Sequence, residues 1–308
     1  MKTHPKVVVI ILNWNGKEDT INCLGSLSSV PYPNYEIVVV DNHSTDGSVE
    51  SLAQQYPQIE VIRNNANLGF AQGNNKGIER ALEMGANYVL LLNNDTIVDR
   101  QFMDYLVQGA ESDQTIGFAG PKIYYLDRHT NGDVISFAGG AFNPWIGARN
   151  RGAGELDSGQ YDEPRIVDYV EGSCFLVKKQ VIHKTGLLDP TYFAYWEDVD
   201  WCMRGLEKGY KSAFFPQAKI WHKVSTSNAN QTKIYYWTRN TFWFMNRKTT
   251  EVQYVAFLVY FFTIYMPSKC FSLALYHRDL ASLRLFLKGV VDGVKKPVRT
   301  KTVRSNKG

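Results

Sequence analysis

The sequence predicts an α/β fold with a Rossmann-like, mostly parallel sheet flanked by helices. Three runs of largely apolar residues, at 7–12, 36–40 and 88–92, lack the alternation of a half-exposed strand. Unbroken apolar runs of this length are typical of strands that are buried on both faces, as in a parallel sheet. Segments with apolar residues at helical spacing lie between these runs, and this alternation predicts crossover helices on both sides of the sheet.

The N-terminal half alternates strand and helix throughout. The first strand is followed by a helix at about 17–28, after which Pro31 and Pro33 break the chain. Asp46 is placed to cap a second helix. The remaining expected elements are a short strand at 60–63, a loop at 67–72, a helix that ends near Gly85, the strand at 88–92 and a helix through 102–110.

Polar residues follow three of the buried strands at the point where each ends, at 13–15, 41–43 and 93–95. Open α/β sheets bind ligands at the carboxyl ends of their strands, so we expect these residues to converge. Neither a G-x-G-x-x-G after the first strand nor a G-x-x-x-x-G-K-[ST] occurs in the sequence. Asp95 is therefore expected to hold Mg²⁺ or Mn²⁺, which prefer oxygen ligands, and through the ion a diphosphate. The alternative is a solvated Asn-Asn-Asp turn.

Composition and charge indicate a globular cytoplasmic protein. The 308 residues are 44% apolar and 21% charged, which suits one large domain or two small ones. The four cysteines show no C-x-x-C spacing and suit a reducing compartment. The first apolar run is short and lacks a small-residue cleavage site, which indicates a strand and not a signal peptide. Nine Lys or Arg against two Asp between Arg278 and Gly308 indicate an acidic partner surface.

The second half begins with strands expected at 118–125 and 134–140. The stretch 141–160 is rich in Gly, Asn and Arg and is expected to be a mobile loop that closes over a ligand. The small pair Gly172–Ser173 either leaves room beside a ligand or forms a plain bend. A strand at 212–220 precedes His222, which either binds the metal or the diphosphate or has a structural role.

Five segments together resemble a known enzyme family. They are, in this order, VVVIILNWNG, EIVVVDNHSTDGS, NNANLGFAQGNNKG, VLLLNNDTIVD and YFAYWEDVDWCMRG. The ordered set is similar to family 2 glycosyltransferases with the GT-A fold, close to the rhamnosyltransferase-like branch, and the resemblance covers about 6–245. It implies an inverting enzyme that moves a sugar from a dTDP- or UDP-linked donor to a hydroxyl acceptor such as a lipid-linked glycan.

The resemblance implies roles for the residues at matching positions. Asn13 and Asp41 would contact the nucleotide base, Asp41 by accepting a hydrogen bond from a pyrimidine ring N–H. Residues 93–95 take the place of the family's Asp-x-Asp motif, but the first position is Asn93, so Asp95 is its only carboxylate. The nucleotide pocket would be lined by Asn67, Gly69 and Asn94.

Asp198 is expected to be the base of the transfer. It lies in the first turn of a helix expected to end near Gly209, and it shares a face with Trp201. An inverting transfer needs a group that takes the proton of the attacking hydroxyl, and a positioned carboxylate can do this. The resemblance also puts Asp198 at the position of the family's base. The alternative is that Glu197 and Asp198 only interact with the helix dipole.

Further residues are expected near the acceptor or the phosphates. Arg204 lies four residues after Asp200 and either serves there or pairs with that carboxylate. Arg239 stands among aromatic residues and either offsets the charge of the leaving diphosphate or packs against those rings. The expected acceptor and phosphate set is Gly172, Ser173, Trp201, Arg204 and Arg239.

The C-terminal segment is expected to associate with a membrane. Residues 254–266 contain one polar side chain, and a helix of this length covers about 20 Å at ~1.5 Å per residue, short of the ~30 Å hydrocarbon core. Pro267 and Lys269 are expected to interrupt the helix before 271–276. The sequence therefore indicates a pair of interfacial helices followed by the basic tail. A buried core helix or a dimer interface is the alternative.

The expected organisation is a GT-A domain at 1–248, divided at about 115 into nucleotide-binding and acceptor halves, and a helical segment at 249–308. The expected location is the cytoplasm, with peripheral attachment to the inner face of the cell membrane. One rival function is a non-catalytic nucleotide-sugar-binding membrane subunit. Nucleic-acid binding is not expected, because the tail has few aromatic residues and the sequence shows no recognised nucleic-acid module. The sequence leaves the oligomeric state open.

Overall fold

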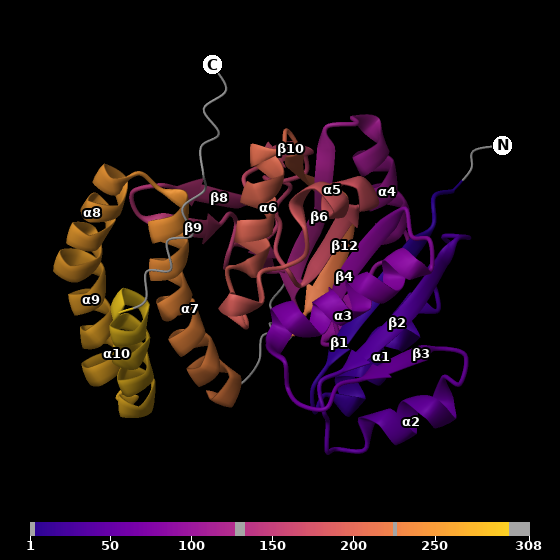
Figure 1. Cartoon of the computed structure of the whole chain (residues 1–308), viewed down its shortest axis with the longest axis horizontal. Helices are drawn as coiled ribbons and strands as arrows, with labels where there is room; N and C mark the ends of the chain where they lie inside the picture. The colour runs from indigo at the N-terminus through magenta and orange to yellow at the C-terminus, as the bar shows by residue number, and fades with distance from the viewer. Residues whose placement is uncertain (1–3, 127–132, 224–226, 296–308) are drawn as a thin grey trace. The chain divides into compact units, whose positions relative to one another are not determined.

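The structure is a computed structural model that describes residues 4–126, 133–223 and 227–295. The chain divides into two compact units (Figure 1). The sheet unit comprises Met1–Ala141, Arg149–Phe193 and Glu197–Val224, and the helical unit comprises Phe142–Ala148, Ala194–Trp196 and Ser225–Gly308. Helix α7 (Ser227–Lys248) thus belongs to the helical unit, whereas the sequence analysis grouped residues up to 248 with the GT-A domain.

A ten-stranded mixed sheet forms the core of the sheet unit. Its order is β10-β12-β6-β11-β4-β1-β2-β3, with β5 paired to β12 and β7 paired to β6. The pairs β1–β2, β2–β3, β1–β4 and β6–β12 are parallel, and β11 is antiparallel to both of its neighbours. The predicted mostly parallel sheet is confirmed. The bounds are β1 (Val7–Asn13), β2 (Tyr35–Asp41), β3 (Glu60–Arg63), β4 (Tyr88–Asn93), β5 (Thr96–Val98), β6 (Ile116–Tyr125), β7 (Ile135–Phe137), β10 (Arg165–Val167), β11 (Cys174–Lys178) and β12 (Lys211–His222).

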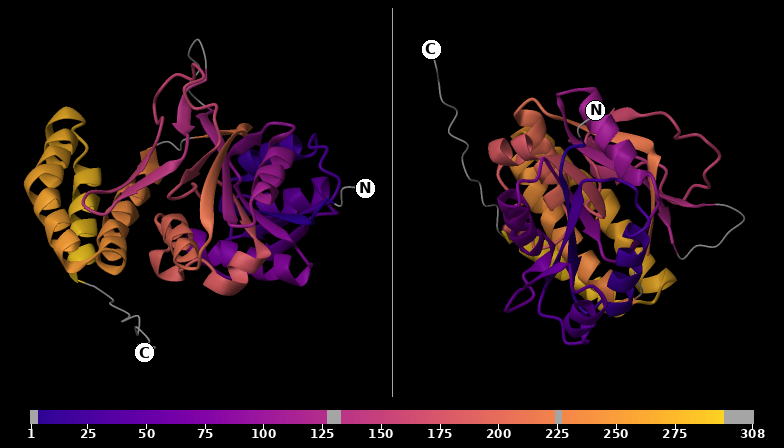
Figure 2. Two further views of the ribbon diagram at one scale, coloured as in Figure 1. Left: turned by 90° about the horizontal axis from the view of Figure 1, so that it is seen from above. Right: turned by 90° about the vertical axis from the view of Figure 1, so that its right-hand side faces the viewer.

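Helices cover both faces of this sheet, as Figures 1 and 2 show. On one face, Tyr88 of β4 donates a hydrogen bond to Glu111 of α4, and Thr20 of α1 donates one to Asn13 of β1. On the other face, Trp201 of α6 packs against Phe175 of β11, and α3 also lies there. The bounds are α1 (Lys17–Leu27), α2 (Ser48–Gln55), α3 (Gly69–Glu83), α4 (Phe102–Ser112), α5 (Lys179–Thr185), η1 (Pro190–Tyr192) and α6 (Glu197–Glu207).

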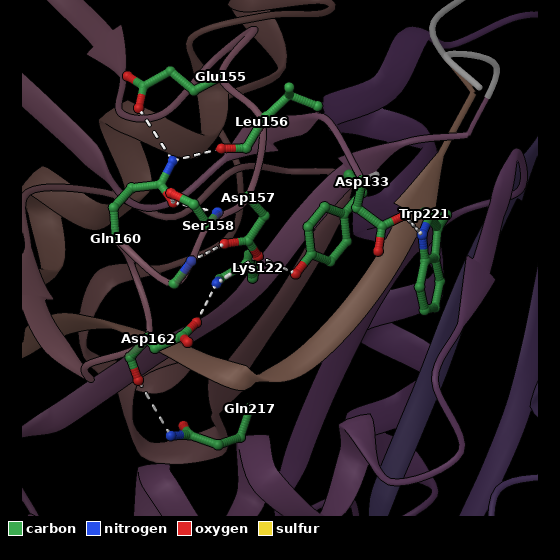
Figure 3. Close-up of polar contacts among 12 residues, drawn as sticks. Lys122, Asp133, Glu155, Leu156, Asp157, Ser158, Gln160, Asp162, Gln217 and Trp221 are labelled. Atoms are coloured by element: carbon green, nitrogen blue, oxygen red, sulfur yellow. Dashed lines mark hydrogen bonds and ion pairs between the residues drawn. The ribbon is translucent and has the colours of Figure 1, made fainter. Parts of the chain in front are cut away.

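The stretch 141–160 contains paired strands, so the expectation that it is a loop throughout is wrong, while its mobility stays a prediction. Its first part forms the paired strands β8 (Gly140–Asn143) and β9 (Gly147–Asn150). The chain after them is tied to the sheet by Lys122 of β6, whose Nζ lies 2.9 Å from Asp157 Oδ2 and 2.6 Å from Asp162 Oδ1 (Figure 3). Tyr124 Oη also donates to Asp157 Oδ2, at 2.6 Å. The Lys122 side chain is fully buried, so we call these four residues the Lys122 clamp.

Residues 251–276 form one continuous helix within the helical unit, so the expected interruption at Pro267 is wrong. The N–H of Met266 bonds to the carbonyl of Phe261, five residues earlier, which widens the helix by a π-type turn just before the proline. This turn accommodates the proline ring, which would clash with the preceding turn of a regular α-helix. The parts are α8 (Glu251–Tyr260), η2 (Phe261–Tyr265), α9 (Met266–Phe271) and η3 (Ser272–Tyr276).

The helix is also longer than the sequence indicated. Its 26 residues extend about 39 Å at ~1.5 Å per residue, which exceeds the ~30 Å hydrocarbon core of a bilayer. By length and composition it is able to cross a membrane, and only 11% of its most apolar 18-residue stretch is buried. The length of this helix therefore does not favour two short interfacial helices over one long helix.

Helix α10 (Leu280–Lys295) packs closely on α7 through two glycines spaced four residues apart. A β-carbon on Gly289 would lie 2.8 Å from the carbonyl oxygen of Tyr235, and one on Gly293 would lie 2.8 Å from Cδ2 of Phe242. Any larger residue would force the two helices apart. Of the basic tail, residues 296–308 lie outside the described part of the chain.

Candidate active site

Asn13 organises the carboxyl edge of the sheet from the end of β1. It is fully buried, and its Nδ2 donates to Asp41 Oδ1 at 2.9 Å and to Ser44 Oγ at 3.1 Å. Its Oδ1 accepts from Thr20 Oγ1 at 3.0 Å and from Asn94 Nδ2 at 3.2 Å. Both ends of the Asn13 amide are engaged, so in the free protein this side chain fixes the positions of Asp41 and Asn94.

Asn42, which the sequence analysis did not single out, shapes the expected nucleotide loop. This side chain is 1% exposed; its Nδ2 donates to the carbonyl of Gly69 at 3.0 Å, and its Oδ1 accepts from Asn64 Nδ2 at 2.8 Å. Asn67 Oδ1 in turn accepts the N–H of Gly69 at 2.9 Å. The sequence gives one signal for Asn42, its place in the polar triplet after β2. Its side chain forms hydrogen bonds with residues at least 22 positions away, which a local pattern does not reveal.

Gly69 begins α3 in a conformation that suits glycine. Its φ is +76°, and a β-carbon there would lie 2.6 Å from the carbonyl oxygen of Phe193. That carbonyl accepts the N–H groups of Phe70 at 2.7 Å and Ala71 at 3.1 Å, in the first turn of α3. The expected nucleotide loop therefore packs against the chain that leads to Asp198.

Asp95 and His222 lie side by side. The Asp95 Oδ1 atom is 3.1 Å from His222 Nε2, and Asn93 Nδ2 is 3.2 Å from the same ring nitrogen. The pairing of β5 with β12 brings them together, along with a bond from the N–H of Lys223 to the carbonyl of Asp95 at 2.9 Å. Two neighbouring ligands of an octahedral ion with bonds of about 2.1 Å stand about 3 Å apart, so this pair fits Mg²⁺ or Mn²⁺.

The protein alone offers few ligands for such an ion. Among the described residues, no group of three or more His, Cys, Asp or Glu is arranged to hold a metal. One carboxylate and one imidazole leave most of the coordination sphere to phosphate oxygens and water, which is how Mg²⁺ is commonly held beside a diphosphate. The donor set therefore suits an ion that arrives with its phosphate ligand.

Asp198 stands at the N-terminal end of α6 and is half-buried. Its Oδ2 accepts the N–H of Gly172 at 2.9 Å, and its Oδ1 accepts the N–H of Val199 at 2.8 Å. Burial raises the pKa of Asp198 to about 6; the two N–H groups oppose this rise, and the charge of Glu171 adds to it. A carboxylate with a pKa nearer to neutrality accepts a proton more readily, as a general base must.

The segment Gly172–Ser173 links the two acidic centres. The N–H of Gly172 bonds to Asp198, and the carbonyl of Ser173 accepts the N–H of Asn93 at 2.9 Å. A β-carbon on Gly172 would lie 3.3 Å from the ring of Phe70 and 3.4 Å from Asp198 Oδ2, so any side chain there would crowd both groups. Asp198 and the 93–95 triplet, about a hundred residues apart in the sequence, are thus held by consecutive residues.

Trp201 and Arg204 have structural partners, which corrects their expected place at the acceptor. Trp201 is fully buried, and its indole N–H donates to the carbonyl of Gly186 at 2.8 Å. Arg204 pairs with Asp200 at 2.7 Å and donates to the carbonyl of Leu187 at 2.9 Å. These contacts assign both side chains to holding α6 against the chain after α5.

Arg239 belongs to the helical unit. Its guanidinium lies over the rings of Trp243 at 4.1 Å and Tyr236 at 4.8 Å, and its Nε donates to Asn240 Oδ1 at 2.9 Å. Burial lowers its pKa from the ordinary value of arginine. These contacts fit the alternative given for Arg239, in which it packs against aromatic rings. A role toward the diphosphate stays a prediction.

The chain is similar to known glycosyltransferases in sequence. A family model for glycosyl transferase family 2 matches residues 8–185, more than half of the chain. An N-acetylglucosaminyl-diphospho-decaprenol L-rhamnosyltransferase of Mycobacterium tuberculosis is 29% identical over an alignment of 229 positions that covers 66% of this chain and 71% of that protein. A dTDP-rhamnosyl transferase of Shigella flexneri is 23% identical over an alignment of 249 positions that covers 77% of this chain and 78% of that protein.

Solved structures share the fold. A mannosyltransferase from Pyrobaculum calidifontis, in complex with GDP-Man and Mn²⁺, superposes with a TM-score of 0.57 at 14% identity and covers 97% of this chain and 89% of its own. GalNAc-T7 with UDP, GalNAc and Mn²⁺ gives a TM-score of 0.62 at 18% identity and 79% coverage, and this chain spans 51% of its length. These likenesses confirm the GT-A fold. The chain belongs to glycosyltransferase family 2 and is a glycosyltransferase with rhamnosyltransferase relatives.

Proposed function

We propose that the protein moves a sugar of the rhamnose class from a dTDP- or UDP-linked donor to a hydroxyl of a lipid-linked glycan, with inversion at the anomeric carbon. The activities for which the mycobacterial and Shigella relatives are named support this substrate class. The observation that carries the proposal is the double contact of residues 172–173, which hold Asp198 on one side and Asn93 on the other. A base and a phosphate-binding triplet that lie this close together suit a displacement at the anomeric carbon of a donor sugar bound between them.

The donor would bind along the carboxyl edge of the sheet. Asp41, fixed by Asn13 and by the N–H of Ser44, accepts the ring N–H of a pyrimidine, while Asn67, Gly69 and Asn94 line the nucleotide pocket. Asp95 and His222 are the residues that would hold a divalent ion. When bound, the ion offsets the negative charge that develops on the leaving diphosphate.

In the transfer, Asp198 takes the proton of the acceptor hydroxyl as the oxygen attacks the anomeric carbon. The bond from that carbon to the diphosphate oxygen breaks, and the nucleoside diphosphate leaves with the electron pair. Gly172 holds the carboxylate in place through its N–H and, lacking a side chain, lets Asp198 and the ring of Phe70 lie close to its backbone. The positioned base supplies roughly 10²–10⁴-fold of the rate.

Thermal-shift titration tests the donor site and the metal together. We expect dTDP-rhamnose to raise the melting temperature more in the presence of Mn²⁺ than in its absence, because a ligand that binds only the folded state stabilises it. Asp95→Asn should remove the Mn²⁺-dependent part and keep the rest. Stabilisation by GDP-mannose alone, or an undiminished Mn²⁺ effect in the variant, would contradict the assignment.

An acceptor assay separates the enzyme from its rival. With a short-chain lipid-linked N-acetylglucosamine diphosphate as acceptor, the enzyme releases dTDP from dTDP-rhamnose in step with product. A non-catalytic sugar-nucleotide-binding subunit would bind the donor and release no dTDP with any acceptor.

The helical unit would attach the enzyme to the inner face of the cell membrane. Its 251–276 helix exposes an apolar stripe at Val252, Val255, Val259 and Phe262, and α10 exposes Leu280, Leu287, Val291 and Val294. Close helix pairs packed through glycines four residues apart, as in α10, are frequent in lipid. Basic residues of α10 and the tail favour anionic headgroups. Whether the long helix crosses the bilayer or lies on it, its outer face would meet lipid.

Flotation with vesicles of phosphatidylcholine and anionic phosphatidylglycerol tests this attachment. The full chain is expected to float, and a variant with Asp at positions 255, 259 and 262 is expected to stay at the bottom. A control with Asp at the exposed positions Ile166 and Leu206 should float like the wild type. Equal flotation of all three proteins would exclude the apolar stripe as the attachment surface.

A further inference from the structure

Glu171 is a second carboxylate beside the proposed base. It precedes Gly172, whose N–H bonds to Asp198, and it is half-buried. Asn150 Nδ2 donates to its Oε2 at 2.7 Å, and Ser173 Oγ donates to its Oε1 at 3.0 Å. Asn150 is itself held by the hydroxyl of the buried Tyr169, at 2.7 Å. Both oxygens of Glu171 are therefore fixed in place before any ligand arrives.

Among the residues that the structure describes, no cation pairs with the carboxylate of Glu171. Both donors are uncharged. A half-buried carboxylate whose partners are all uncharged gains from further hydrogen-bond donors. An ionised carboxylate has about four lone-pair positions, so two bonds leave acceptor capacity on each oxygen. A sugar hydroxyl is a donor that fits this capacity.

The surroundings of the carboxylate also suit a sugar. The ring of Phe70 and Asp198 Oδ2 both lie close to Gly172, 3.3 Å and 3.4 Å from where a β-carbon would stand. Small-molecule sites typically combine apolar or aromatic walls with a few fixed polar groups. Glu171 and Asp198 are the fixed carboxylates here, and Phe70 is the aromatic wall.

We infer that Glu171 is an acceptor-specificity residue, whose carboxylate binds a second hydroxyl of the acceptor sugar next to the hydroxyl that Asp198 deprotonates. This inference rests on the proposed function. It means that the enzyme selects acceptors that carry a free hydroxyl neighbouring the one that is glycosylated. A structural role for Glu171, confined to holding Asn150, is the competing explanation.

Steady-state kinetics with dTDP-rhamnose and the lipid-linked N-acetylglucosamine probe separates these explanations. Glu171→Gln is expected to raise the acceptor KM roughly 10–100-fold, as for loss of a hydrogen bond to a charged group, with kcat within about threefold and the donor KM unchanged. Glu163→Gln, an equal charge change at an exposed position in the same stretch, should leave all three constants unchanged.

The pH profile gives a second readout. The charge of Glu171 helps to raise the pKa of Asp198. The charge of Asp198 in turn helps to raise the pKa of three neighbouring groups, Glu197, Tyr169 and Cys202. Removing the charge of Glu171 should move the acidic limb of kcat/KM to lower pH. Glu171→Asp keeps the charge but has a side chain one methylene shorter. It should therefore raise the acceptor KM and leave the acidic limb of kcat/KM in place.

Three outcomes would overturn the inference. An unchanged acceptor KM in Glu171→Gln, with an active wild type, removes Glu171 from the acceptor subsite. Equal losses in kcat for Glu171→Gln and Glu171→Asp, with both KM values and the acidic limb unmoved, indicate the structural role. Donor stabilisation without any transfer by the wild type refutes the proposed function itself, and the inference falls with it.

Discussion

Asp198→Asn is expected to lower kcat by about 10²–10⁴-fold while donor binding survives. The amide keeps the shape of the side chain and an oxygen that accepts the N–H of Gly172, so the position of the side chain is preserved. It cannot take a proton from the acceptor hydroxyl, and that step is the one the substitution removes. The measurement is single-turnover transfer alongside donor titration by thermal shift.

Controls and pH sharpen this test. Glu207→Gln, at the exposed end of the same helix, should retain wild-type turnover. The wild-type kcat/KM should decline as the pH falls through about 6, because protonation of Asp198 removes the base. Turnover of the Asn variant within tenfold of the wild type would exclude Asp198 as the base.

The same carboxylate should reduce stability at the pH where it works. Its pKa in the folded protein is raised, so the folded state binds the proton more tightly than the unfolded chain does. The wild type is therefore expected to lose stability as the pH rises from the ordinary carboxyl range through about 6. Asp198→Asn should unfold at a higher temperature than the wild type at pH 8, and the gap should close toward pH 4.

The parts of the fold that the sequence predicted are those in which neighbours along the chain decide the outcome. A strand buried on both faces needs an unbroken apolar run, so β1, β2 and β4 were visible directly. The register that pairs Asn13 with Asp41 then follows from parallel strands that end together. The positions of Asp41 and Asp95 at the carboxyl edge could be predicted for this reason.

Contacts between distant segments were beyond such reasoning. Asn42 and Glu171 look like ordinary polar residues until residues 20 or more positions away close around them. Helical spacing puts Trp201 on the same face as Asp198, yet Trp201 packs in the core against the rings of Phe118 and Phe175. Periodicity describes one helix at a time and says nothing of what packs against it.

Backbone conformation is a second feature that the sequence does not reveal. Phe193, Tyr195 and Trp196, just before the proposed base, all have positive φ, although none of them is glycine. Pro267 carries the usual signal for the end of a helix, and a π-type turn overrides that signal. Such departures are decided by the surrounding tertiary structure, so a single sequence does not reveal them.

Lys122→Met is expected to lower the free energy of unfolding by about 3–5 kcal/mol, the usual cost of removing one partner from a buried ion pair. Methionine fits the space of the lysine chain but leaves the Asp157 carboxylate, 14% exposed, without its cation. Burial alone would raise the pKa of Asp157, but the bonds from Tyr124 and Lys122 outweigh it and hold that pKa below its ordinary value. The measurement is urea unfolding at pH 7.

The matched control is Lys211→Met on the neighbouring strand. Lys211 pairs with Asp113 at 3.4 Å, and both side chains are more than 40% exposed, so its loss should cost within about 1 kcal/mol. Because the cost at Lys122 comes from an uncompensated carboxylate, adding Asp157→Asn to Lys122→Met should recover part of the lost stability. Equal losses in the two single lysine variants, or no recovery in the double variant, would show that the Lys122 clamp does not hold the chain after β9 to the sheet.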